Sequence, residues 1–187
     1  MGSKVRLREK RLGDALNDYS WRTDPELAQL DATPPLKTTF SEYLQSYAIQ
    51  LRHPSLTRCT FAVETLDGKH IGNGLFYGID ETGGETELGI MIGERSYWDK
   101  GYGTSAVTSL VDYIFRHTNL NRIYLKTLKS NRRAKRCFER CGFLPYGHLE
   151  RDGASFVLME IHRIKWREGQ DKPCGQIKKG RQANEND

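Results

Sequence analysis

The sequence predicts one domain of the α/β (α+β) class, with a mixed sheet that carries helices on its faces. Three observations support this prediction. The 187 residues are enough for a single hydrophobic core. Short runs with the two-residue alternation of strands are separated by segments with the helical period. At the centre of the chain, residues 86–127 have the pattern of a strand–helix–strand crossover.

The first half of the chain is expected to form one strand, two helices and three further strands. Residues 4–9 alternate and predict the first strand, and helices are predicted over 14–19 and 39–52. In the second helix, apolar and aromatic residues recur at the spacing of one buried face: Phe40, Tyr43, Leu44, Tyr47 and Leu51. Strands are predicted over three more ranges, the first two joined by the hairpin signal Asp67-Gly68: 59–66, 70–79 and 86–92.

The second half is expected to alternate helices and strands and to end in a hairpin. A helix over 102–117, a strand over 122–127 and a helix over 131–140 are predicted, and Gly142 supplies the C-terminal cap of the last. The final strands, 143–149 and 156–164, bring the totals to about seven strands and four helices. The predicted domain spans residues 4–164, and the polar segment 165–187 is expected to be a disordered tail.

Composition restricts the location of the protein and the kinds of site it can hold. Mean hydropathy is −0.68, and no run approaches the roughly 18 apolar residues of a membrane span, so no membrane partner is expected. The N-terminus lacks the apolar region of a secretory signal, which predicts a cytoplasmic protein. Four cysteines are too few for a disulfide framework and lack metal-ligand spacing, so reduced thiols and no metal are expected: Cys59, Cys137, Cys141 and Cys174.

Charge is unevenly distributed along the chain, whose net charge is +5. Residues 122–140, the basic band, contain eight bases and one acid, whereas residues 80–94, the acidic band, contain five acids and no base. The basic band suits a polyanion and the acidic band suits a cation. Three arginines at four-residue intervals would also allow RNA contact, but no aromatic residues interleave with them, so nucleic acid is not an expected partner.

The clearest chemical signal is a glycine-rich loop between a strand and a helix. Gly101-Tyr102-Gly103 opens the predicted helix, and glycines let the backbone approach a ligand closely. The first free N–H groups of a helix point at the same place, so the loop predicts a pyrophosphate site. Gly101-x-Gly103-x-x-Ala106 also matches the dinucleotide fingerprint, which leaves an NADP-binding enzyme as an alternative. Against that alternative, the motif begins past residue 100 and the next strand does not end in an acid.

A second group of residues follows, Asn131-x-x-Ala134-x-x-x-Phe138-x-x-x-Gly142-Phe143. Together with the loop Trp98-Asp-Lys-Gly-Tyr-Gly-Thr104, the strand Glu87-Leu-Gly-Ile90 and the order of elements, it resembles the GNAT superfamily of acyl-CoA N-acyltransferases. Within that superfamily the chain looks most like ribosomal-protein-alanine and spermidine N-acetyltransferases. The resemblance covers about residues 4–164 and is specific over 87–143. It implies a GNAT-like sheet whose splayed strand pair binds acetyl-CoA, and transfer of the acetyl group to a primary amine.

The resemblance assigns coenzyme binding to particular residues. Backbone N–H groups of about 100–104 would hold the pyrophosphate, and the backbone of 91–93 would pair with the pantetheine arm like an added strand. Trp98 replaces the family's usual Arg or Gln, and Asn131 would hydrogen-bond the arm or serve only as a helix N-cap. The complete predicted set is Met91, Ile92, Gly93, Trp98, Asp99, Lys100, Gly101, Tyr102, Gly103, Thr104, Asn131, Ala134 and Phe138.

Amine acetylation needs a base and a donor for the developing negative charge. Glu87 is the predicted base, with a hydrogen-bonded structural acid as the alternative. A backbone N–H near Met91 or Ile92 is the predicted oxyanion donor. Phe138 stands where the family usually has a tyrosine that protonates the leaving thiolate, which leaves an inactive, binding-only relative as an alternative. Other groups remain candidates for that proton: Tyr102, Tyr146 and water.

The acceptor is expected to be a small amine or a protein N-terminus. Asp31 and Glu85 are predicted to hold its ammonium group, and Trp21 is predicted to line the pocket. Because the chain is basic overall, long-range charge steers polyamines poorly. Direct transfer is expected, since no Cys or Ser lies in a recognisable nucleophile setting. A homodimer is among the predicted assemblies.

Overall fold

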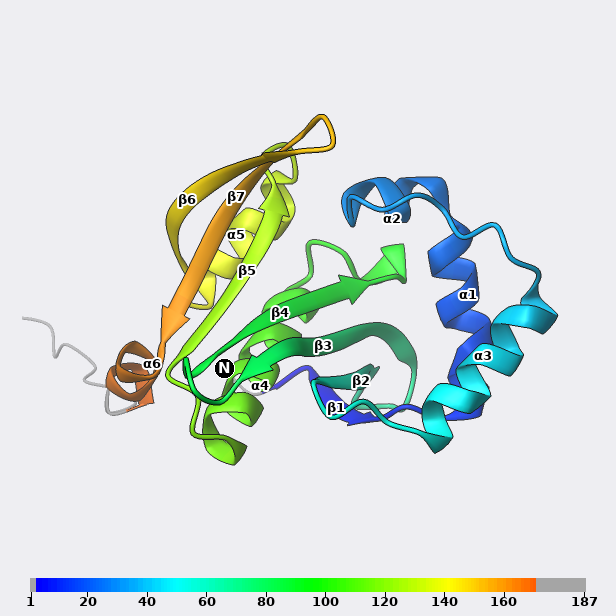
Figure 1. The fold of residues 1–187 in the computed structure, drawn as a ribbon, viewed down its shortest axis with the longest axis horizontal. Coiled ribbons are helices and arrows are strands. Elements are labelled where there is room, and N and C mark those ends of the chain that lie inside the picture. The colour runs from blue at the N-terminus through cyan, green and yellow to red at the C-terminus, as the bar shows by residue number, and fades with distance from the viewer. Residues whose placement is uncertain (1–2, 171–187) are drawn as a thin grey trace, which may run out of the picture.

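The computed structural model describes residues 3–170 and contains a seven-stranded mixed sheet (Figure 1). Its strands are β1 (Val5–Glu9), β2 (Arg58–Thr65), β3 (His70–Asp80), β4 (Glu85–Ile92), β5 (Arg122–Leu128), β6 (Leu144–Arg151) and β7 (Ala154–His162). They lie in the order β1-β2-β3-β4-β5-β7-β6. The β4–β5 pair is parallel and the other pairs are antiparallel. The predicted class and number of strands are confirmed.

The described residues form six helices, two more than predicted. They are α1 (Ala15–Thr23), α2 (Pro25–Leu30), α3 (Phe40–Arg52), α4 (Tyr102–His117), α5 (Arg132–Arg140) and α6 (Arg163–Gln170), with 3₁₀ turns η1 (Leu12–Asp14) and η2 (Arg95–Tyr97). The missed helix α2 does carry a local signal. Asp24 caps it by accepting the N–H of Leu27 at 3.0 Å, and Pro25 occupies the first position, where no N–H is needed.

The other missed helix, α6, begins before the predicted domain boundary at residue 164 and runs past it. The polar composition of this segment concealed one anchoring aromatic residue. The Trp166 ring packs against Phe115, with ring centroids 5.5 Å apart, and its indole donates to Asp112 at 2.5 Å. Arg163 donates to the carbonyl oxygens of Thr118 and Leu120 beyond the end of α4. Residues 171–187, the rest of the predicted tail, lie outside the described residues.

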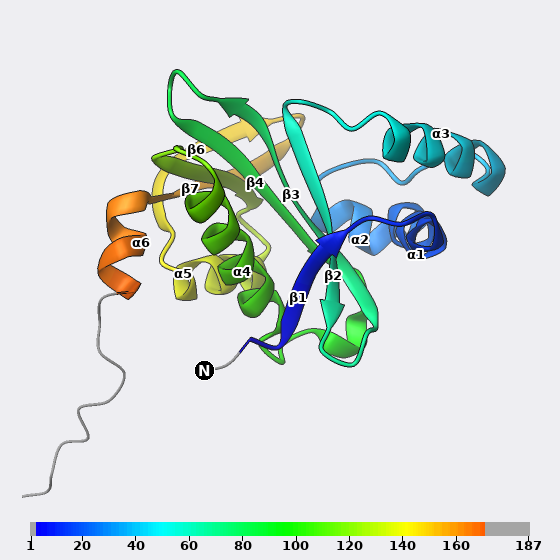
Figure 2. The ribbon, with the colours of Figure 1, turned by 90° about the horizontal axis from the view of Figure 1, so that it is seen from below.

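The main core lies between the sheet and α4 with α5, which cover the same face (Figure 2). The helix predicted over 102–117 is confirmed as α4, and its apolar stripe is buried, each member being at most 3% exposed: Val107, Leu110, Val111, Ile114 and Phe115. Thr86 and Leu88 of β4 belong to this buried side. Because side chains alternate along a strand, Glu85 and Glu87 lie on the opposite face.

The stripe predicted for α3 is only partly buried. Tyr47 is 8% exposed, but Leu51 is 37% exposed. The reason is that α3 packs against α1 and η1 rather than against the sheet. The predicted end of α5 is confirmed, since Gly142 follows it with a φ of +91°, a conformation that favours glycine.

The parallel strands β4 and β5 separate after three residue pairs. The last of these joins Glu87 to Tyr124, and β4 then continues to Ile92 while β5 continues to Leu128. The predicted splayed strand pair is therefore present, with Glu87 at the point where the strands part.

Candidate active site

A cleft of about 1690 Å³ opens where β4 and β5 separate. Its loop side is lined by residues from the β4–α4 loop, the β5–α5 turn and α5: 97–99, Gly101, Gly103, Thr104, 128–134, 136–138 and Arg140. Its α2 side is lined by residues from α1, from α2 and the turn after it, from β2 and β3, and from the β6–β7 turn: Asp18, Arg22, Leu27, 29–33, Arg58, Asn73, Leu75, Tyr77 and 151–156. In Figure 1 α2 and the β6–β7 turn both lie above the end of β4, and α2 is the nearer of the two.

On the loop side, the first turn of α4 has no side-chain cap. Its N-cap is Gly101, in the left-handed conformation with a φ of +83° that a residue with a side chain adopts at a cost. The N–H groups that follow are free of intrahelical partners by the geometry of any helix start. Gly103 also lines the cleft, and a Cβ added there would lie 3.5 Å from the Cys137 sulfur. Of the predicted loop, the side chains of Lys100 and Tyr102 are outside the cleft lining.

Bases from the basic band surround this helix start. Five of them line the loop side: Lys129, Arg132, Arg133, Arg136 and Arg140. Within residues 3–170, none of the five has a carboxylate within 4.0 Å. Arg133 lies over the Trp98 ring, 3.5 Å from its centroid, and so links α5 to the loop. Uncompensated bases beside free N–H groups make a site for a polyanion.

The remaining predicted residues of α5 form the wall of the cleft. Asn131 is the N-cap of α5 and accepts the N–H of Ala134 at 3.1 Å, as the capping alternative requires. Ala134 lines the cleft beside it. Phe138 is 5% exposed and packs edge-on against Phe143, so its ring is part of the core and part of the wall.

Hydrogen bonding along β4 distinguishes the two predicted oxyanion donors. The Gly93 N–H donates to the carbonyl of Ile71 on β3 at 3.0 Å. Because successive N–H groups of a strand point to opposite sides, the N–H of Ile92 points away from β3 and into the splay, and that of Met91 does not. The carbonyl of Ile92 faces the splay as well, where it accepts the Trp98 indole N–H at 2.6 Å. The sequence did not predict this role of Trp98.

Glu87 lies at the fork of the strands with its side chain 13% exposed. Lys126 donates to it at 2.8 Å, and the Tyr77 phenol is hydrogen-bonded to it. Burial raises the pKa of Tyr77, and the bond to Glu87 raises it further, so the phenol stays protonated near neutral pH. Neither partner was predicted, although the two-residue period of β5 places Lys126 on the Glu87 face.

Family comparison decides what kind of protein carries this cleft. The family model described as an acetyltransferase (GNAT) domain matches residues 4–144. The chain belongs to this GNAT family. It is also 31% identical to the N-acetyltransferase p20 of Bacillus licheniformis over 130 residues, 68% of this chain and 72% of that protein. The spermidine N(1)-acetyltransferase of Vibrio cholerae is 26% identical over 149 residues, which cover 80% of this chain and 84% of the relative.

Solved structures show the same GNAT fold. The Vibrio cholerae spermidine N-acetyltransferase in complex with CoA and spermine superposes with a TM-score of 0.78 at 23% identity, covering 88% of this chain and 98% of that one. An aminoglycoside acetyltransferase in complex with coenzyme A gives a TM-score of 0.73 at 20% identity, covering 89% and 99%. The GNAT protein described here is an acetyl-CoA-dependent N-acetyltransferase, which removes the NADP-binding alternative. No helix within residues 3–170 is long and apolar enough to span a membrane.

The residues of this GNAT protein fit acetyl-CoA. The free N–H groups at the start of α4 and the unpaired bases of α5 match the phosphates of the coenzyme. The edge of β4 beyond Glu87, left without a partner by β5, can accept an extended chain. Among the described residues, no group of three potential metal ligands is present.

Two of the three predicted acceptor residues lie away from the GNAT cleft. Glu85 pairs with Arg122 at 2.6 Å and does not line it. Trp21 is 5% exposed and lies behind Gly93, where an added Cβ would be 2.1 Å from the indole. Asp31 does line the cleft. Its side chain is exposed at the surface of the cleft, but the surrounding walls partly desolvate the carboxyl, which raises the pKa of Asp31. The positive charge of Arg22 lowers that pKa and only partly offsets the effect of desolvation.

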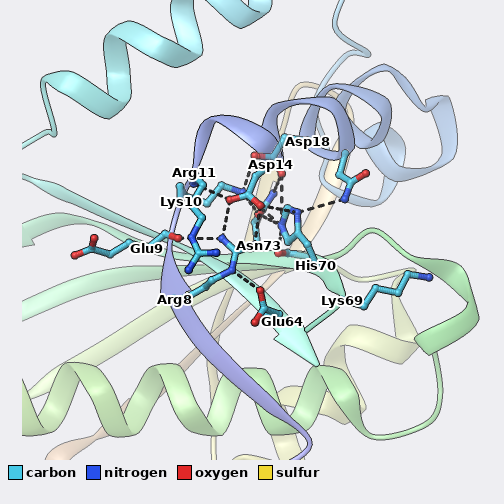
Figure 3. Close-up of polar contacts among 12 residues, drawn as sticks. Arg8, Glu9, Lys10, Arg11, Asp14, Asp18, Glu64, Lys69, His70 and Asn73 are labelled. Carbon is cyan, nitrogen blue, oxygen red and sulfur yellow. Dashed lines mark hydrogen bonds and ion pairs between the residues drawn. The ribbon is translucent and has the colours of Figure 1, made fainter. Parts of the chain in front are cut away.

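A buried ion-pair network fixes the α2 side of the cleft to the sheet (Figure 3). Arg8 on β1 donates to both carboxylate oxygens of Asp14, at 2.8 and 2.7 Å, and to Glu64 on β2. Lys10 pairs with Asp18 of α1 at 2.6 Å, and Asn73 of β3 donates to the same carboxylate at 2.7 Å. Because Asp18 and Asn73 also line the cleft, the network positions its wall.

Proposed function

We propose that this enzyme acetylates the primary amine of a small molecule by direct transfer within the cleft. The observation that carries the proposal is the position of Glu87 at the fork of β4 and β5, on the same cleft as the uncapped start of α4. Relatives named for spermidine and for aminoglycosides support a small amine. A protein N-terminus as acceptor, a cytoplasmic location and a homodimer stay predictions from the sequence.

The loop side would hold the coenzyme. N–H groups of residues 102–104 and the bases of α5 bind its phosphates, and the open edge of β4 aligns its extended arm. Bound there, the coenzyme supplies an acetyl thioester that an amine can attack. The Ile92 N–H, which points into the splay, stabilises the negative charge that develops on the carbonyl oxygen.

Glu87 would act as the base. Its carboxylate accepts a proton from the acceptor ammonium, directly or through one water, so that the neutral amine attacks. Lys126 and Tyr77 hold the carboxylate in position through an ion pair and a hydrogen bond. The departing thiolate needs little assistance because thiols are already fairly acidic. The buried ring of Phe138 contributes no proton.

Replacing Glu87 by Gln tests this role. We expect kcat to fall by about 10²-fold, because general-base catalysis contributes roughly that factor or more, with acetyl-CoA affinity nearly unchanged by calorimetry. The matched control is Glu81→Gln, an exposed acid in the β3–β4 turn that should leave kcat unaltered. Unchanged rates for Glu87→Gln across the pH range would remove Glu87 as the base.

Replacing Gly103 by Val tests the coenzyme site. An added Cβ meets its nearest atom at 3.5 Å, so the fold accommodates it, whereas the strained φ of Gly101 makes that glycine a poorer target. We expect the variant to keep its thermal stability and to lose measurable acetyl-CoA binding. NADPH serves as the control ligand for the unmodified protein. Full affinity in the variant would show that the phosphates bind elsewhere.

A further inference from the structure

Of the acids that line the cleft, Asp18, Glu87 and Asp152 are paired with bases of the protein itself. Within residues 3–170, Asp31 has no base within 4.0 Å. Asp18 bonds Lys10 at 2.6 Å, Tyr47 at 2.9 Å and Asn73 at 2.7 Å. Glu87 bonds Lys126 at 2.8 Å, and Asp152 bonds Arg151 at 3.2 Å. A ligand with several positive charges would have to compete for these carboxylates.

Two arginines on the same side have no such partner. Arg22 and Arg58 both line the cleft and are exposed, and within residues 3–170 neither has a carboxylate within 4.0 Å. The guanidinium of Arg58 lies over the Tyr77 ring, 5.6 Å from its centroid, which orients it without neutralising it. The α2 side therefore presents the positive charge of Arg58 to the cleft without an ion-pair partner, whereas the charge of Arg22 also acts on Asp31.

The register of the sheet aligns one of these arginines with the base. Arg58 on β2 is paired with Tyr77 on β3, and Tyr77 is paired with Glu87 on β4. Two strand spacings separate the backbones of Arg58 and Glu87 by about 10 Å. The contacts of both side chains with Tyr77 place them on one face of the sheet. A small molecule can therefore reach Glu87 with one end and Arg58 with the other.

We infer that the acceptor is a zwitterion, a primary amine that carries a carboxylate or phosphate group a few bonds away. Its amine lies at Glu87, and its anionic group is bound by Arg58, with Arg22 adding positive potential on the same side. A guanidinium suits either anion because its donors match two oxygens at once. The inference rests on the proposed function and departs from the spermidine and aminoglycoside acceptors for which the relatives are named.

Matched pairs of amines test the inference. 4-Aminobutyrate and 1,4-diaminobutane share a chain and differ in having a carboxylate or an ammonium at the far end. O-Phosphoethanolamine and ethylenediamine form the corresponding phosphate pair. With saturating acetyl-CoA, we expect kcat/KM to favour at least one anionic member over its diamine by about tenfold. Which pair shows the larger ratio distinguishes a carboxylate from a phosphate.

Substitution of Arg58 locates the effect. Arg58→Gln should abolish the preference, and Arg58→Glu should reverse it in favour of the diamine, chiefly through KM. The control is Arg52→Glu, an exposed change of the same charge on α3, outside the cleft lining, which should leave the preference unchanged.

The outcomes separate this inference from the proposed function. Acetylation that favours the diamines, or a preference that Arg58→Glu does not alter, overturns the zwitterion and leaves the acetyltransferase function intact. Failure to acetylate any of the four amines by an enzyme that binds acetyl-CoA overturns the zwitterion together with the proposed acceptor class.

Discussion

Replacing Asp14 by Asn tests the ion-pair network that holds α1 on the sheet. Asp14 is 5% exposed and accepts hydrogen bonds from Arg8 at 2.8 and 2.7 Å and from the Arg11 N–H at 2.7 Å. Desolvation by burial raises the pKa of Asp14, but these hydrogen bonds outweigh it and lower the pKa from 3.8 to about 2. At neutral pH that shift contributes about 2 kcal/mol to the free energy of unfolding.

The variant should unfold more easily by about 2–3 kcal/mol at neutral pH, because Arg8 loses one of its two charged partners in a buried site. A carboxyl with a lowered pKa stabilises the fold above its unfolded pKa, and the contribution disappears as the pH falls through the folded value. The two proteins should therefore converge between about pH 4 and pH 2. Urea unfolding followed by circular dichroism at several pH values measures the difference.

The control for this experiment is Asp152→Asn. Asp152 pairs with Arg151 at 3.2 Å, but its side chain is 86% exposed, so its loss should change stability by less than about 0.5 kcal/mol. A difference below about 1 kcal/mol for Asp14→Asn at neutral pH, or one that persists unchanged in acid, would refute the reasoning.

Three further predictions concern packing and thiol chemistry. Gly93→Ala should lower the free energy of unfolding by about 1–3 kcal/mol, because the new Cβ would lie 2.1 Å from the Trp21 ring, whereas Gly13→Ala, with nothing within 4 Å, should not. A hydrogen bond with Cys141 lowers the pKa of Cys137 to about 7. Iodoacetamide labelling of Cys137, read by mass spectrometry, should therefore slow below that pH. Because Cys137 lines the cleft, bound acetyl-CoA should protect the thiol from labelling. Trp166→Ala should cost about 2–4 kcal/mol in urea unfolding; a negligible change would make α6 dispensable.

The proposed base illustrates how far the sequence reaches into the site. Alternation along β4 places Glu87 on the face away from the core, and the structure puts it there. Its neighbours Tyr77 and Lys126 come from strands 10 and 39 positions away in the chain, and only the register of the sheet brings them to the carboxylate. The same register pairs Glu85 with Arg122 and Glu87 with Lys126, which are acids of the acidic band and bases of the basic band. From the sequence, the acidic band was expected to suit a cation and the basic band a polyanion.

The sequence by itself determined the elements with strong local signals. The stripe of α4, the glycines that open it and the two-residue period of the strands depend on neighbouring residues, and they predicted the fold class and the pyrophosphate loop. The splay and the coenzyme followed from the resemblance to the GNAT superfamily. Tertiary structure alone decided which side chains share the cleft: Trp21 packs behind Gly93 rather than in the pocket, and Arg58 aligns with Glu87 through two strand pairings. The physical reason is that periodicity fixes the face of a residue, whereas its partner depends on long-range pairing that no local pattern records.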